Sequence, residues 1–233
     1  AQYAKMVSPS QADGLIQLRA QIPLGDSLMN DNGLLPMVNA CEVIDCGKYP
    51  VVTLDNRAAA KAMTRHLIEF GHTRIAMIKG PDSSPLTQDR LLGYKDALRE
   101  ANLPFNENLL FPGDFTLQAG YKAGADIAKI DEKLRPTAVF CENDETAIGT
   151  IQAFKQVGMR VPDDISVAGF DDIAFSAFCD PPLTTIAQPA EEFGRTAVTL
   201  LVDVLNGKTR KAPKVIMPFE LITRQSTGPV KTM

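Results

Sequence analysis

Three segments of this chain decide its fold: Pro-Thr-Ala-Val-Phe-Cys-Glu-Asn-Asp-Glu (136–145), Ile-Ser-Val-Ala-Gly-Phe-Asp-Asp (165–172) and Pro-Pro-Leu-Thr-Thr-Ile-Ala-Gln-Pro (181–189). Each contains a short run of apolar residues that stops abruptly at polar ones. Parallel strands that helices cover on both faces have this pattern, because neither face meets water. The polar residues follow the carboxyl ends of the strands, which is the edge where open parallel sheets bind ligands.

Outside these segments, predicted strands and helices alternate along the chain. Further strands are expected at 13–18, 37–40, 51–54, 74–78, 109–111 and 215–222. Helices are expected at 57–70, 89–101, 117–130, 145–157 and 191–205, because apolar side chains recur there at helical spacing. The alternation predicts an α/β fold of two doubly wound lobes with right-handed crossovers.

The predicted break between the lobes falls near residues 70–74. We expect an amino-terminal lobe at 1–72, a carboxy-terminal lobe at 73–182, a return segment at 183–208, and the last strands and tail at 209–233. The first lobe then begins with only three strands. Because a doubly wound lobe usually has about five, we expect it to be truncated at its amino end by roughly 50 residues.

Charge and hydropathy exclude several classes of partner. The chain has 24 basic and 28 acidic side chains, a net charge of −4, and its densest basic run, Lys208–Lys214, favours a solvated loop. We therefore do not expect this chain alone to bind duplex DNA. No apolar stretch is long enough to cross a membrane, and the first residues contain no secretory signal. These observations favour a cytoplasmic protein.

Metal binding and catalysis are also poorly supported. The four cysteines have neither metal-ligand spacing nor a Cys-x-x-Cys pair, and the chain has two histidines. We expect no metal and four free thiols, a Cys41–Cys46 disulfide being the alternative. Neither a nucleotide-binding glycine motif nor a nucleophile paired with histidine is present. The sequence therefore predicts neither a cofactor nor an enzyme.

Eight motifs occur in order and resemble the effector-binding domain of the lactose-repressor (LacI/GalR) family of transcription factors. They are Val-Thr-Leu-Asp-Asn (52–56), His-Leu-x-x-x-Gly-His-x-Arg-Ile-Ala (66–76), Arg-Leu-x-Gly-Tyr (90–94), Gly-Asp-Phe (113–115), Pro-Thr-Ala-Val-Phe-Cys (136–141), Asn-Asp (143–144), Val-Pro-Asp-Asp-Ile-Ser-Val-Ala-Gly-Phe-Asp-Asp (161–172) and Leu-Thr-Thr-Ile-x-Gln-Pro (183–189).

The resemblance implies a type I periplasmic-binding-protein-like fold that closes on a small effector and forms a homodimer. It also implies that operator DNA is bound by an amino-terminal helix-turn-helix domain, which we do not find in this chain. Within the family, Gly-Asp-Phe-Thr-x-x-Ala-Gly (113–120) and the segment 178–189 resemble the cytidine-repressor subfamily. That similarity implies a nucleoside effector, with a sugar as the alternative. A periplasmic sugar-binding protein of an uptake system would share the fold.

Five residues are candidate ligand contacts. Arg90 and Asp171 match the family's ligand-binding arginine and aspartate, and their donor-only and acceptor-only groups suit a vicinal diol. Phe115 matches an aromatic position that packs on the ligand, while Asn143 and Asp55 follow strand ends. We expect alanine at Arg90 or Asp171 to weaken binding with little change in stability.

Each candidate also has a structural interpretation. Arg90 could be a solvated helix arginine and Phe115 a core residue. Asp171 could cap the following helix, although Asp172 fits that role better. Asp144 is expected to cap the helix that begins at residue 145, and Asp55 could cap the helix at 57–70.

Overall fold

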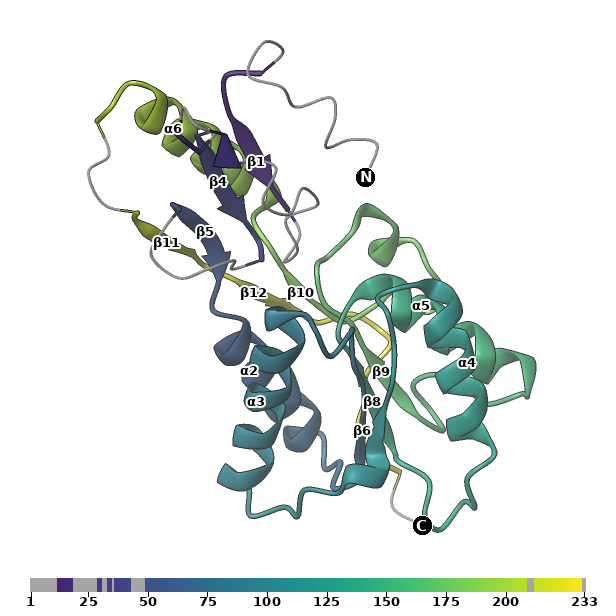
Figure 1. The fold of residues 1–233 in the computed structure, drawn as a ribbon. Helices are drawn as coiled ribbons and strands as arrows, with labels where there is room; N and C mark the ends of the chain where they lie inside the picture. Colours follow the sequence, from purple (N-terminus) through teal and green to yellow (C-terminus); the bar gives the residue numbers. More distant parts are fainter. Residues whose placement is uncertain are drawn as a thin grey trace. The chain divides into compact units, whose positions relative to one another are not determined.

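The computed structural model of the protein describes residues 12–18, 29–30, 33–34, 36–42, 49–208 and 212–231. Its contacts divide the chain into two compact units, each made of two segments (Figure 1). The first unit comprises Ala1–Asp55 and Pro189–Pro218, and the second comprises Asn56–Gln188 and Phe219–Met233. Both units have the α/β character that the sequence predicts.

The first unit contains a parallel sheet in the order β1-β4-β5-β11. Helix α6 packs against three of these strands, β1, β4 and β5. Strands β4 and β5 are buried along their whole length, as their apolar runs predict. A separate antiparallel pair is formed by β2 and β3. The bounds are β1 Leu15–Gln17, β2 Met29–Asn30, β3 Gly33–Leu34, β4 Met37–Ala40, β5 Val51–Leu54, β11 Lys214–Met217 and α6 Ala190–Leu205.

The second unit contains a parallel sheet in the order β7-β6-β8-β9, with helices α2 and α3 on one face and α4 and α5 on the other (Figure 1). A parallel bridge from β9 leads to β10, which pairs antiparallel with β12. This is the doubly wound arrangement that the sequence predicts. The bounds are α2 Asn56–Glu69, β6 Ile75–Ile78, α3 Pro85–Glu100, η2 Glu107–Leu109, β7 Leu110–Phe111, α4 Leu117–Ala128, β8 Ala138–Cys141, α5 Asp144–Gln156, β9 Ser166–Ala168, η3 Ala174–Ala177, β10 Thr185–Ala187 and β12 Glu220–Ile222.

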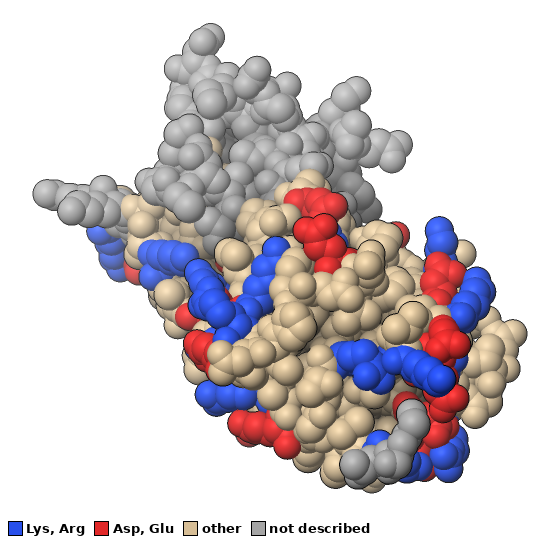
Figure 2. Space-filling view, turned by 90° about the horizontal axis from the view of Figure 1, so that it is seen from below, with Lys and Arg blue, Asp and Glu red and all other residues tan. Residues whose placement is uncertain are grey.

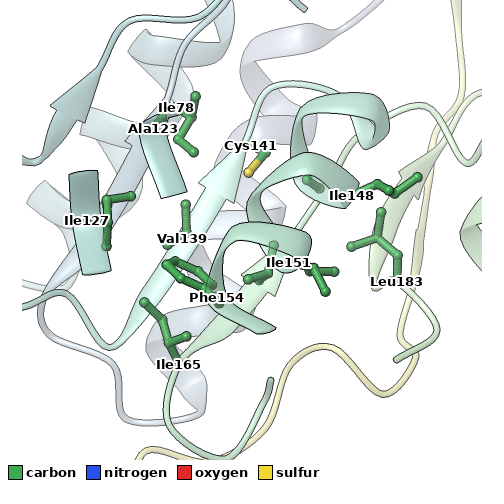
Figure 3. Close-up of a cluster of buried hydrophobic side chains, with 13 residues drawn as sticks. Ile78, Ala123, Ile127, Val139, Cys141, Ile148, Ile151, Phe154, Ile165 and Leu183 are labelled. Atoms are coloured by element: carbon green, nitrogen blue, oxygen red, sulfur yellow. The ribbon is translucent and has the colours of Figure 1, made fainter. Parts of the chain in front are cut away.

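One hydrophobic cluster of the second unit lies between its sheet and the helices α4 and α5 (Figure 3). Phe154 of α5, Val139 of β8 and Ile127 of α4 are fully buried in it. Burying each side chain of this size stabilises the fold by about 1.5–3 kcal/mol. The packing holds β8 in place, so the residues that follow β8 have a rigid support.

The unit boundaries differ from the predicted lobe boundaries. We predicted breaks at 72/73, 182/183 and 208/209, whereas the contacts separate the units at 55/56, 188/189 and 218/219. The first difference arises because α2 packs against α3 and so belongs to the second unit. The others arise because β10 and β12 pair with each other, while β11 pairs with β5.

The predicted strand at 215–222 was wrong as a single element. Its residues form two strands, β11 and β12, which belong to different sheets. Pro218 lies between them, and proline has no N–H group with which to continue a strand ladder. The break allows the chain to pass from one unit to the other.

The described residues also show how charged side chains are distributed and which cysteines are thiols. Basic and acidic side chains are interspersed on the face shown in Figure 2. No helix in the described ranges is long and apolar enough to cross a membrane. The same residues contain no group of three His, Cys, Asp or Glu side chains that could hold a metal ion. Cys141 and Cys179 are free thiols, whereas Cys46, the partner in the alternative Cys41–Cys46 disulfide, lies outside the described residues.

Candidate functional site

Arg90 is a buried arginine, with 4% of its surface exposed. Helix α3 begins at Pro85, earlier than predicted, because Ser84 caps it and proline suits the first position. Arg90 Nε donates to Asn56 Oδ1 at 3.0 Å, and Nη1 donates to the carbonyl oxygen of Glu142. The guanidinium lies 3.6 Å from the centroid of the Phe170 ring. The alternative of a solvated helix arginine is therefore wrong.

Asp171 lies beside Arg90, with 3.9 Å between its Oδ1 and Arg90 Nη2. Its backbone has a φ of 112°, a conformation that costs a non-glycine residue free energy and is common at functional sites. Gln188 Nε2 donates to Asp171 Oδ1 at 2.5 Å. Burial raises the pKa of Asp171 to about 6, while the Arg90 charge opposes the shift. The side chain stays 31% exposed, so a ligand can reach it.

The predicted capping roles of the two aspartates in this loop were wrong. The short helix η3 has Ile173 at its cap position, without a side-chain hydrogen bond. Asp172 instead forms an ion pair with Arg224 at 2.8 Å. The side chain of Asp171 contacts Arg90 and Gln188 and caps no helix. These contacts fit a ligand-binding role better than a capping role.

Phe115 and Asn143 form a second pair. Asn143 Nδ2 donates to the carbonyl oxygen of Phe115 at 2.8 Å, and Phe115 has a φ of 67°. The Phe115 ring covers Gly80 so closely that a Cβ there would lie 2.1 Å from the ring. Glycine is therefore required at residue 80 for the ring to take this place. Phe115 is half-buried at the surface of the unit and is not a core residue.

Asn143, and not Asp144, caps α5. Asn143 Oδ1 accepts a hydrogen bond from Thr146 N at 3.0 Å. Asp144 turns inward, and its carboxylate accepts hydrogen bonds from Ile173 N, Ser176 Oγ and Thr185 Oγ1 at 3.0, 2.6 and 2.5 Å. Asn143 thus positions both the helix and the Phe115 loop.

Glu142 joins the two pairs, and the sequence did not single it out. Its carbonyl oxygen accepts from Arg90, and its Oε2 accepts from Gly80 N at 2.9 Å. The residue is 1% exposed, and burial raises the pKa of its carboxyl group to about 7. The available signal was its place directly after an apolar strand, beside Asn143. Asn56, Phe170 and Gln188 were also missed, although each stands within a quoted motif.

Asp55 is separate from the other candidates. It is the last residue of the first unit and is exposed, whereas Arg90, Phe115, Asn143 and Asp171 all lie in the second unit. Its ligand role stays a prediction.

Phe115, Asn143 and Asp171 follow strands β7, β8 and β9 at the carboxyl edge of the sheet, and Arg90 lies in α3, the helix after β6. Arg90 can only donate hydrogen bonds and ionised Asp171 can only accept them. Such a pair can hold a compound with adjacent hydroxyl groups, and an aromatic ring nearby can pack on an apolar ring face.

Comparison with known proteins identifies the family of this chain. Residues 64–227 match the periplasmic binding protein-like domain family. The HTH-type transcriptional repressor CytR of Escherichia coli strain K12 is 40% identical over 225 residues, which cover 97% of this chain and 65% of that protein.

Two solved structures are similar along almost the whole chain. The complex of the transcriptional regulator CelR with cellobiose has a TM-score of 0.87 and 30% identity, covering 97% of this chain and 69% of that one. A LacI family transcriptional regulator from Enterococcus faecium with bound ribose has a TM-score of 0.87 and 27% identity. The match covers 98% of this chain and 84% of that one.

The fold and the site thus define a periplasmic-binding-protein-like domain. The chain belongs to the lactose-repressor (LacI) family of transcription regulators, as its ordered motifs predict, and corresponds to their effector-binding domain. It spans 65% of the length of CytR.

Proposed function

We propose that this chain senses a nucleoside, cytidine, on behalf of a transcriptional repressor. The Arg90–Asp171 pair carries the proposal, because it offers a donor-only and an acceptor-only group 3.9 Å apart at the carboxyl edge of a parallel sheet. The 2′- and 3′-hydroxyls of a ribose can both donate to Asp171 and accept from Arg90. The half-buried Phe115 ring supplies a surface for the base or the sugar.

Asn143 supports the same site. Asn143 keeps one N–H after bonding Phe115, and this group can donate to the base or the sugar edge. A ligand role for Asp55 is a separate proposal, which rests on its place after a strand end. Similarity to the cytidine-repressor subfamily in segments 113–120 and 178–189 favours a nucleoside over a free sugar.

For the whole protein we propose repression of transcription through operator DNA, because the relative CytR is an HTH-type repressor. DNA binding then belongs to a helix-turn-helix domain and takes place in the cytoplasm. The chain itself forms a homodimer in this proposal and has no catalytic role.

Calorimetry with cytidine, 2′-deoxycytidine, ribose and glucose tests the effector. We expect cytidine to bind best and Asp171→Ala to weaken its binding about tenfold to a hundredfold, because a hydrogen bond to a charged group is lost. The 2′-deoxy compound should lose a similar factor. Asp172→Ala is the matched control, since Asp172 is the neighbouring residue but pairs with Arg224; it should bind like wild type. Unchanged binding by Asp171→Ala would refute the site.

A free sugar is the second candidate effector. Two similar regulators are solved with cellobiose and with ribose, and the Arg90–Asp171 pair suits their hydroxyls equally well. Tighter binding of ribose or glucose than of cytidine in the same titrations would favour this candidate. A role in sugar uptake has less support, since the three relatives described above are transcription regulators.

A further inference from the structure

Glu142 falls between two of the family motifs, those at 136–141 and 143–144. Its carboxyl group is almost completely buried, and only one of its oxygens, Oε2, is hydrogen-bonded, to Gly80 N. Its other oxygen, Oε1, lacks a well-aligned hydrogen bond among the described residues, and the nearby Thr87 hydroxyl interacts with the carboxyl group and lowers its pKa. A buried carboxyl group with a single well-aligned hydrogen bond is unfavourable for folding. This cost points to a role at the site itself.

The charges around Arg90 are unequal. Arg90 faces the carboxylate of Asp171 at 3.9 Å, and its charge also acts on Glu142, whose pKa it lowers against the effect of burial. The single positive charge of Arg90 therefore offsets only one of two carboxylates. Arg90, Asp171 and Glu142 together have a net charge of −1 when both carboxyl groups are ionised. Lys79, the other cation that acts on Glu142, is paired with Asp82 at 2.6 Å. The site has no surplus positive charge from these groups.

We propose that Glu142 is a specificity-determining residue that excludes anionic ligands from the Arg90–Asp171 site and restricts it to neutral, hydroxyl-bearing compounds. The inference rests on the proposed function, because it assumes that the ligand binds at this pair. An arginine without a counter-charge attracts phosphates and carboxylates. Here the guanidinium is already compensated, so an added negative charge meets the surplus carboxylate.

Calorimetry with a neutral and an anionic form of one ligand tests the role of Glu142. The probes are cytidine and cytidine 5′-sulfate, which carries a single negative charge, at pH 8. We expect wild type to bind cytidine about tenfold more tightly than the sulfate, or more, because one partly screened charge opposes the sulfate. The ratio of these two affinities is the quantity to compare between proteins. Glu142→Gln keeps an acceptor for Gly80 N and removes the charge, so it should narrow this ratio about tenfold. Glu142→Asp keeps the charge and should preserve the ratio.

A change of pH gives a second measurement that needs no variant. At about pH 6.5 much of Glu142 and a smaller part of Asp171 are protonated, so the wild-type ratio should narrow. The charged groups that act on Glu142 are Arg90 and Lys79, and those that act on Asp171 are Arg90, Asp144 and Glu145. A ratio that is the same at both pH values contradicts the proposal even if Glu142→Gln does not fold.

The outcomes separate this inference from the proposed function. If cytidine binds but all three proteins share one ratio at pH 8, Glu142 has no role in specificity and the proposed function stands. If wild type binds the sulfate as tightly as cytidine, the site does not exclude anions. The inference about Glu142 is then wrong, and the proposed function stands. If wild type binds neither cytidine nor ribose, the proposed function fails and this inference fails with it.

Discussion

Arg90 shows how burial changes the meaning of a single residue. From the sequence we expected alanine there to affect binding and not stability. Arg90 is 4% exposed and donates to Asn56 and to the Glu142 carbonyl. Its removal would leave these acceptors and two carboxyl groups without their cation, which is costly in a buried site. Asp171, which is partly exposed, is therefore the cleaner probe of ligand binding.

Glu142 makes the stability of the fold depend on pH. Its folded-state pKa of about 7 lies above its ordinary value of 4.5. The folded protein therefore holds this proton more tightly than the unfolded chain does, so protonation stabilises the fold, and the contribution is lost as the pH rises through 7. We expect the free energy of unfolding of wild type, minus that of Glu142→Gln, to be about 1–2 kcal/mol larger at pH 5.5 than at pH 8.

Urea denaturation of both proteins at the two pH values measures this difference. His66 and His72, whose pKa values burial lowers, act in the opposite direction. Both are present in wild type and variant, so their effect cancels. A difference that does not change with pH would show that Glu142 is not protonated in this range.

At the scale of the elements, α4 and α5 cross at two glycines. A Cβ on Gly149 would lie 2.0 Å from the carbonyl oxygen of Leu117, and one on Gly120 would lie 2.0 Å from that of Thr146. The two backbones can approach this closely only because neither glycine has a side chain. The contact fixes α5, and with it Asn143, which caps this helix.

We expect Gly149→Ala to destabilise the protein by about 1–3 kcal/mol, because the added methyl group forces the helices apart. Gly194→Ala is the control, since Gly194 lies in α6 with no atom within 4 Å of its would-be Cβ. It should be neutral or stabilising by up to about 1 kcal/mol, because alanine favours a helix more than glycine does. Urea denaturation measures the change in the free energy of unfolding for each variant. Equal changes in Gly149→Ala and Gly194→Ala would argue against the close crossing.

At the scale of the whole molecule, α6 presents an apolar stripe to the surface. Val198, Val202 and Leu205 are 52%, 46% and 44% exposed, and their spacing places them on one side of the helix. Exposed apolar side chains in a row are typical of surfaces that another protein covers. A second copy of the chain is the partner that the predicted homodimer requires.

We expect the chain to dimerise in sedimentation equilibrium, and the double variant Val198→Asp/Val202→Asp to shift it toward monomer, because buried aspartates oppose association. Thr199→Asp, at an exposed polar position of the same helix, should leave the equilibrium unchanged. A wild-type chain that stays monomeric at high concentration would contradict the expected dimer.

The amino-acid sequence by itself determined the order of strands and helices and the edge of the sheet that carries the site. β4, β5 and β8 form where short apolar runs predict them, and the side chain of Thr116 caps α4. These features are local, because periodicity and capping depend on residues close together in the chain. The family motifs predicted Arg90 and Asp171 as ligand contacts, and that role stays a prediction.

Only the tertiary structure decided which groups meet. Ile78 of β6 pairs with Cys141 of β8, so the residues that follow, Gly80 and Glu142, come within hydrogen-bond distance. Asp144 turns away from the helix cap because Ser176 and Thr185 offer it partners from distant segments. β11 and β12 separate because their pairing strands lie in different units. Such contacts depend on strand order and register, which bring together residues far apart in the chain, and no local pattern encodes them.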